Sequence, residues 1–164
     1  CQMVDIQLPE QKIIPSMQAI VGINSFGGLL WPSNGGANIS EPLFLAGGTY
    51  DLITPALSEQ FQLFLAAKPN LLSRSLIIEG ASHFSPIRVE GQEESASGED
   101  LFQLGDAFVG VQPLAVQKLL GNQIIQFLYS LEESKPLDLM VNQQNYDLKY
   151  HLLDRSIVER IMNN

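Results

Sequence analysis

Two short strand-like segments, each ending at glycine, constrain the fold of this chain more than any other feature. The first extends from Pro42 to Gly47 and the second from Ser75 to Gly80. The first is a continuous apolar run, which is typical of a strand buried on both faces of a parallel sheet, because strands with one solvated face alternate apolar and polar side chains. We therefore expect two central strands of a parallel sheet.

A helix is expected between these two strands. Thr54 and Pro55 are typical of a helix start, with threonine as the N-cap and proline at the first helical position, and Pro69 ends the pattern. Between them, apolar residues recur at three- and four-residue spacing, namely Leu57, Phe61, Phe64 and Leu65. Strand, helix and strand of these lengths predict a βαβ unit with parallel strands and a right-handed crossover.

The remaining pattern completes an α/β fold. Residues 18–23 form a third strand-like segment, apolar and β-branched, and predict a strand, followed by a Gly- and Pro-rich loop over 27–42. Amphipathic patterns predict helices over 113–132 and 146–162. The second of these includes His151, which we interpret as a structural or surface residue. We expect a single domain with about three mainly parallel strands and flanking helices.

The acidic composition argues against several classes of partner. Eighteen acidic against nine basic side chains give a net charge of −9, which repels phosphate backbones and anionic lipid surfaces, so we expect no nucleic-acid partner. Several acidic residues fall within 88–105, where we expect a mobile, solvated loop. No apolar stretch approaches the roughly 18 residues of a membrane-spanning helix, so no membrane span is expected.

The sequence offers little support for a metal or a cofactor. One cysteine, Cys1, and two histidines far apart do not form a ligand cluster, and the single cysteine permits no internal disulfide. No Gly-rich phosphate-binding loop opens a helix after a strand. We expect neither a bound metal nor a cofactor.

Two residues that can carry chemistry follow the two central strands. Asp51 comes shortly after the first and His83 shortly after the second, separated by one helix and one strand. The carboxyl ends of neighbouring parallel strands meet at one edge of a sheet, so both side chains are expected there. An aspartate that orients a histidine is the supporting half of a nucleophilic triad. The alternatives are an aspartate that only forms a turn and a histidine packed in a loop.

In these features the chain resembles the C-terminal half of the α/β-hydrolase superfamily, particularly its branch of dienelactone-hydrolase and platelet-activating-factor-acetylhydrolase-like proteins. The resemblance covers roughly residues 18–130. It rests on a Pro, apolar run, Gly-x-x-Asp pattern from Pro42 to Asp51, and on a Gly-x-x-His pattern from Gly80 to His83. It implies that Asp51 is the triad acid and His83 the general base. It also implies that residues 1–164 are the C-terminal portion of a larger α/β-hydrolase.

The nucleophile of that family lies at a G-x-S-x-G elbow between a strand and a helix, upstream of the acid. Ser25 follows a strand, but Ile23 replaces the small residue that the elbow needs. Only 26 residues separate Ser25 from Asp51, and the segment between them is rich in Gly and Pro. We therefore expect the nucleophile strand and the oxyanion hole to lie outside this chain, and a complete small hydrolase built on Ser25 is the less favoured alternative.

We therefore hypothesise that the chain is the C-terminal part of a serine-type hydrolase of carboxylic esters, lipid esters or lactones. This part is expected to be inactive alone, and the complete protein is expected to take a small-molecule ester or lipid substrate. The alternative is a non-catalytic α/β binding or assembly module. Because the chain starts at Cys1 and not at methionine, we interpret it as part of a longer protein, with a mature lipoprotein as the alternative, and the compartment stays open. The strand at 18–23 would then expose an unpaired edge, which predicts self-association into a homo-oligomer.

Overall fold

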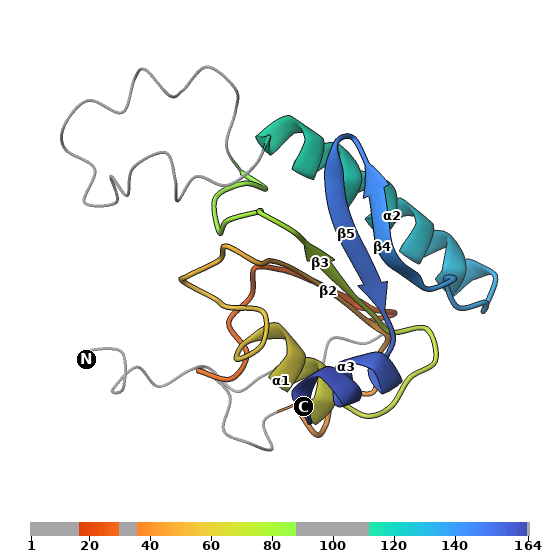
Figure 1. The fold of residues 1–164 in the computed structure, drawn as a ribbon. Coiled ribbons are helices and arrows are strands. Elements are labelled where there is room, and N and C mark those ends of the chain that lie inside the picture. Colours follow the sequence, from red (N-terminus) through yellow and green to blue (C-terminus); the bar gives the residue numbers. More distant parts are fainter. Residues whose placement is uncertain (1–16, 30–35, 88–111, 164) are drawn as a thin grey trace.

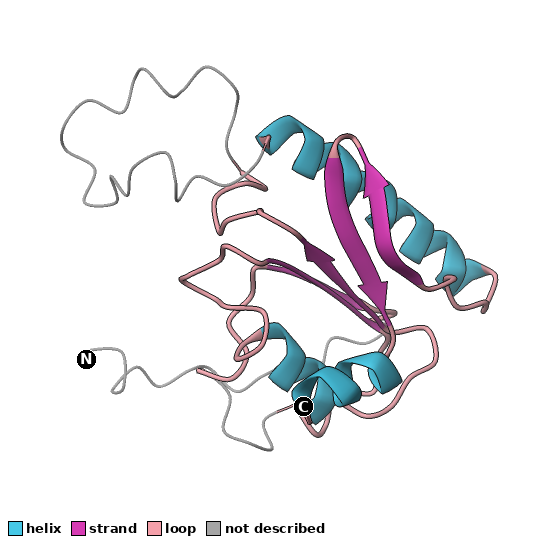
Figure 2. Cartoon of the chain, viewed as in Figure 1, coloured by secondary structure: helices cyan, strands magenta, loops and turns pink. Residues whose placement is uncertain are grey.

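The protein is described by a computed structural model that covers residues 17–29, 36–87 and 112–163. The chain contains both strands and helices, and their arrangement is shown in Figures 1 and 2. In chain order they are β1 (Ile20–Ile23), β2 (Leu43–Gly48), α1 (Gln60–Ala66), β3 (Arg74–Ile78), α2 (Pro113–Glu132), β4 (Met140–Asn145), β5 (Leu148–Leu153) and α3 (Arg155–Met162). The predicted loop over 88–105 lies outside the described residues.

The strands form a five-stranded open sheet in the order β1-β2-β3-β5-β4. β1, β2 and β3 are parallel, as predicted, whereas β5 is antiparallel to both β3 and β4. The expected count of about three strands was therefore wrong, because the C-terminal hairpin extends the sheet beyond β3. The fold class is a mixed α/β protein.

Helices cover both faces of the sheet, and each face has its own apolar core (Figure 1). On one face α2 packs through Val116, Leu119 and Phe127 against side chains of β2, β3 and β5. On the other face α1 and α3 cover Leu43 and Ile77, among others. All residues of β2 and β3 are buried, which confirms the expectation of two central strands.

The helix between β2 and β3 begins later than predicted. Thr54 is not its N-cap: the segment after it forms a turn in which the N–H of Glu59 donates to the carbonyl of Pro55 (2.9 Å), and α1 begins at Gln60. The physical reason is that the hydroxyl of Thr54 contacts groups in other loops, as described below, and does not cap the helix. The helix predicted over 113–132, in contrast, has the bounds of α2.

The helix predicted over 146–162 was wrong in its first half. Residues up to Leu153 form β5, paired with β4, and only Arg155–Met162 is helical. Tyr146 and Asp147 both have positive φ (54° and 59°), as the two central residues of a tight hairpin turn do. Alternating side chains of β5 are buried against α2, and pairing with β3 outweighs the helical spacing of the same apolar residues.

β1 forms one edge of the sheet. Its alternate backbone groups bind β2, since the N–H of Ile20 donates to Pro42 O (2.9 Å) and that of Asn24 donates to Ala46 O (2.8 Å). The backbone groups of Val21 and Ile23 therefore point away from β2, and each of these residues is 40% exposed. The predicted exposed edge is thus present among the described residues. None of the helices in the described part of the chain is long and apolar enough to cross a membrane.

Candidate functional site

The loops that follow β2 and β3 bring Asp51 and His83 into contact. Nδ1 of the imidazole lies 3.0 Å from Oδ2 and 3.2 Å from Oδ1 of the carboxylate, across 32 residues of sequence. The carboxylate is fully buried and the imidazole is 24% exposed. The expected meeting of these two side chains at the carboxyl edge of the parallel strands is therefore found.

Hydrogen bonds inside its own loop hold the Asp51 carboxylate in place. Oδ1 accepts from the backbone N–H groups of Ile53 (3.0 Å) and Thr54 (2.7 Å), and Oδ2 accepts from the hydroxyl of Thr54 (2.8 Å). An aspartate side chain that accepts hydrogen bonds from backbone N–H groups two and three residues later in the chain forms an Asx turn. The turn fixes the rotamer of the side chain, so the carboxylate meets the imidazole in one orientation.

Asn24 and Thr54 join the loops after β1, β2 and β3. The Thr54 hydroxyl lies 3.0 Å from both the carbonyl of Asn24 and Nδ1 of His83. The Asn24 side-chain amide in turn donates to the carbonyl of His83 (2.8 Å). Asn24 and Thr54 are both buried. Sequence reasoning missed both. The Asp-x-x-Thr spacing was an available signal for Thr54, and asparagine directly after a strand, here at a φ of 46°, was one for Asn24.

Gly48 allows the loop that carries Asp51 and the loop that carries His83 to approach each other. A Cβ atom at this position would lie 2.0 Å from the carbonyl oxygen of Ala81, which no packing tolerates. The close approach lets the N–H of Tyr50 donate to that same carbonyl (3.0 Å). The glycine that ends β2 thus determines that the residues immediately before Asp51 lie against the residues immediately before His83.

The contacts of His83 define its tautomer. An ionised carboxylate only accepts hydrogen bonds, so Nδ1, which faces Asp51, carries the proton of the neutral ring. Nε2 is then the basic nitrogen, and none of the hydrogen bonds of His83 to described residues involves it. The edge of the Phe84 ring packs against the imidazole, with centroids 5.5 Å apart and planes at 81°. The arrangement can accept a proton at Nε2 while Asp51 stabilises the resulting cation.

Ser25 does not join this pair. Its hydroxyl is buried and has no hydrogen-bond partner among the described residues, so it makes no hydrogen bond with the imidazole of His83. Its backbone carbonyl accepts from the side chain of Gln60 (3.0 Å), the first residue of α1. Ser25 therefore lies where β1 meets α1, and no described contact links its hydroxyl to the basic nitrogen of His83.

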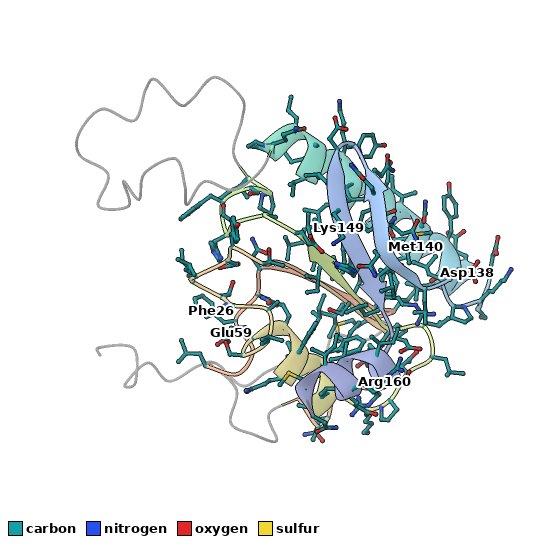
Figure 3. The ribbon with its side chains drawn as sticks, in the orientation of Figure 1. Phe26, Glu59, Asp138, Met140, Lys149 and Arg160 are labelled. Carbon is teal, nitrogen blue, oxygen red and sulfur yellow. The ribbon has the colours of Figure 1, made fainter. Side chains whose placement is uncertain are left out.

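The loop after β1 is fastened to the start of α1 by Glu59, which Figure 3 labels together with Phe26. Its Oε2 accepts from the backbone N–H groups of Gly27 (2.8 Å) and Leu29 (3.0 Å). A Cβ atom on Gly27 would lie 2.1 Å from the carbonyl of Glu59, so this contact requires glycine. These bonds hold the loop that carries Asn24, and through it the backbone of His83.

Metal-ligating side chains do not cluster in the part of the chain that the structure describes, where no group of three or more His, Cys, Asp or Glu residues could hold an ion. His151 lies in β5 and not in a helix, and its Nε2 contacts Glu79 at 2.8 Å. It is far in sequence and separate in its contacts from the Asp51–His83 pair. Comparisons of the chain with protein-family models, curated proteins and solved structures find no match.

Proposed function

We propose that this chain is the C-terminal part of a serine-type α/β-hydrolase that cleaves carboxylic esters, such as lipid esters or lactones. The observation that carries the proposal is the contact between Asp51 and His83 at the carboxyl edge of three parallel strands. Ligands of open parallel sheets bind at this edge, and an aspartate-held imidazole with a free Nε2 is the proton-transfer part of a triad.

In the proposed mechanism a serine outside this chain attacks the acyl carbonyl, and Nε2 of His83 takes the serine proton. The imidazolium then gives that proton to the leaving alcohol. A water molecule, deprotonated by Nε2, next attacks the acyl-enzyme, and the imidazolium returns the proton to the serine as the acid leaves. Asp51 holds the imidazole in register and stabilises its charged form. In this scheme the oxyanion donors, like the serine, lie outside this chain. Asn24 and Thr54 are positioning residues in this scheme because they act through His83 and Asp51.

The edge strand β1 supports the same proposal. The outward backbone groups of Val21 and Ile23 have the spacing that another parallel strand requires. These residues pair in register with Phe44 and Ala46 of the core under α2, so their side chains lie on that face of the sheet. We propose that the nucleophile strand of the complete protein pairs there. Without that strand, a second copy of this chain could pair with the same edge, which is the reason that self-association into a homo-oligomer is expected.

The test uses the longest natural form of the protein and a chromogenic ester. Asp51→Asn is expected to lower kcat by about 10⁴-fold and His83→Ala by at least as much, whereas an exposed control, Glu133→Gln, leaves kcat unchanged. A loss of stability with little loss of turnover would instead favour the non-catalytic binding or assembly module.

The 164-residue chain alone is expected to hydrolyse esters negligibly and to resist labelling by a fluorophosphonate probe. Labelling of the isolated chain that disappears in Ser25→Ala would replace this proposal by a complete hydrolase built on Ser25.

A further inference from the structure

The hairpin of β4 and β5 contains a bulge opposite His151. The register of the two strands shifts between Met140 and Gln143, so Val141 and Asn142 together stand opposite His151 alone. Asn142 has a φ of 56°, which residues other than glycine seldom adopt. The extra residue of a bulge is left out of the backbone ladder, so its N–H is available to a side chain.

The imidazole of His151 supplies the partner for this N–H. The backbone N–H of Asn142 donates to Nδ1 (3.0 Å), and Nε2 on the other side of the ring lies 2.8 Å from Oε1 of Glu79. An ionised carboxylate only accepts hydrogen bonds, so Nε2 carries the proton, and Nδ1, which accepts, carries none. Both bonds therefore exist together only while the ring is neutral and in this one tautomer.

Two charged side chains, Glu79 and Lys149, lie at this contact. Nζ of Lys149 lies 2.9 Å from Oε1 of Glu79, the same oxygen that faces His151. The hydrogen bond from Lys149, and next that from His151, hold the pKa of Glu79 below its usual range, so the carboxylate is ionised at neutral pH. Lys149 lies on β5 and is labelled in Figure 3, as is Met140 of β4.

The other elements around His151 are apolar or neutral where they face it. His151 lines a groove of about 740 Å³, to which α1 contributes Phe61, α3 contributes isoleucines and the loop after β2 contributes the phenol of Tyr50. Among the described residues of the groove wall, Glu79 is the single carboxylate, and no lysine or arginine is present. The charges that act on His151 are therefore those of Glu79 and Lys149.

A proton added to the neutral imidazole of His151 goes to Nδ1, because Nε2 already carries one. Nδ1 then becomes a donor and can no longer accept the N–H of Asn142. The bond from Nε2 to Glu79 becomes charge-assisted and stronger, so the ring stays with Glu79. The His151 side chain is 18% exposed, whereas Asn142 is an exposed residue whose N–H can turn to water. The backbone of the bulge is thus the part that moves.

We propose that His151 is a pH-sensitive switch whose neutral form holds the bulge of β4 against β5 and whose protonated form releases it. Val141 and Asn142 are the β4 residues of the groove wall, so release changes the shape of the groove. Imidazole is the side chain that ordinarily changes charge between about pH 5 and 8, so mild acid operates the switch. The switch is independent of the proposed ester hydrolysis and uses none of its residues.

The test is an NMR titration of the 164-residue chain between about pH 8 and about pH 5. At the alkaline end, the nitrogen-15 shifts of the ring should show the proton of His151 on Nε2. As the pH falls, the amide signal of Asn142 and the methyl signals of Val141 should shift with the same midpoint as the protonation of Nδ1.

Hydrogen exchange gives a second measurement on the same chain. The protection of the Asn142 amide, corrected for the intrinsic exchange rate at each pH, should fall by about two- to tenfold across that midpoint. The amide of Gln144, which lies in the same strand and pairs with Lys149, is the control and should keep its protection.

A variant without a titrating ring tests the origin of the change. His151→Gln retains His83 and every carboxylate, so any pH effect of those groups persists in it. The signals of Asn142 and Val141 should stay constant over the same pH range in this variant.

Three results would overturn the proposal: a proton on Nδ1 of the neutral ring, an Asn142 amide that does not change while His151 is protonated, or the same change in His151→Gln. Should His151→Gln fail to fold, the midpoints of Asn142 and of the His151 ring in the unaltered chain decide the question, because the switch requires them to be equal.

Discussion

The hydroxyl of Thr54 lies 3.0 Å from Nδ1 of His83, although the two residues come from different loops. The same oxygen lies 2.8 Å from Oδ2 of Asp51, so one buried hydroxyl touches both members of the candidate pair. Nδ1 therefore contacts three oxygens, one from Thr54 and two from Asp51, whereas Nε2 makes no hydrogen bond to the described residues.

Replacement of this hydroxyl tests its positioning role. Thr54→Val keeps the shape but leaves buried polar atoms of Asn24 and Asp51 with one partner fewer, so the free energy of unfolding should fall by about 1–3 kcal/mol. Thr54→Ser retains the hydroxyl and should lose about 1 kcal/mol for the missing methyl. Urea unfolding measures both. NMR shifts of the two imidazole nitrogens of His83 should change in the valine variant and stay constant in the serine variant.

Asp51 is expected to stabilise the loop as well as orient the imidazole. Asp51→Ala removes the acceptor of the Thr54 backbone N–H, which is buried, and should cost about 1–3 kcal/mol for each buried donor left unpaired. Asp51→Asn keeps one oxygen for the turn and should cost less. Glu133→Ala, at an exposed site, serves as the control and should stay within about 0.5 kcal/mol of the unaltered chain. An equally small effect of Asp51→Ala would contradict the role assigned to the turn.

The N-cap of α3 predicts a pH dependence of stability. Burial raises the pKa of Asp154, but bonds from Ile157 and Ser156 and the charge of Arg74 outweigh it, so the pKa in the folded protein is below the usual value. A lowered pKa contributes stability that is fully present above the unfolded value, about 3.9, and is lost as the pH falls through the folded value.

Asp154→Ala should therefore cost about 0.5–2 kcal/mol near neutral pH, where the carboxylate caps the helix, and less at acidic pH. Asp154→Asn keeps a capping oxygen without a titrating group, so its stability relative to Asp154→Ala should not change with pH. Urea unfolding across the acid range measures these differences, and a constant gap between the unaltered chain and Asp154→Asn would contradict the prediction.

The outer edge of β1 predicts self-association that one proline can reduce. The N–H of Val21 points away from β2, so Val21→Pro removes an edge donor without breaking the pairing of β1 and β2. Light scattering should show a mass that rises with concentration for the unaltered chain and a smaller rise for Val21→Pro. Gly22→Pro, at a position that faces β2, should unfold β1 and is the disruptive comparison. A monomer at high concentration would argue against the edge as a contact site.

Local pattern was sufficient for the parallel part of the fold. The strand-like segments at β2 and β3 and the long amphipathic pattern of α2 reflect burial that each segment needs by itself, so their types could be predicted from neighbouring residues alone. The parallel arrangement of β2 and β3 then placed Asp51 and His83 at one edge, because a strand, a helix and a strand of these lengths leave few other connections.

The remaining features depended on partners distant in sequence. Apolar residues over 146–162 fit a helix by spacing, yet pairing with β3 and β4 makes half of that segment a hairpin. Thr54 looked like a helix cap, yet the loop after β1 supplies a carbonyl that draws its hydroxyl into the site. Local residue pattern was enough to identify the segments that must be buried and the two residues that can meet. The way in which Asn24, Thr54 and Gly48 hold those two residues together depends on contacts in the folded chain, because hydrogen bonds and close approaches between loops leave no periodic trace in the sequence.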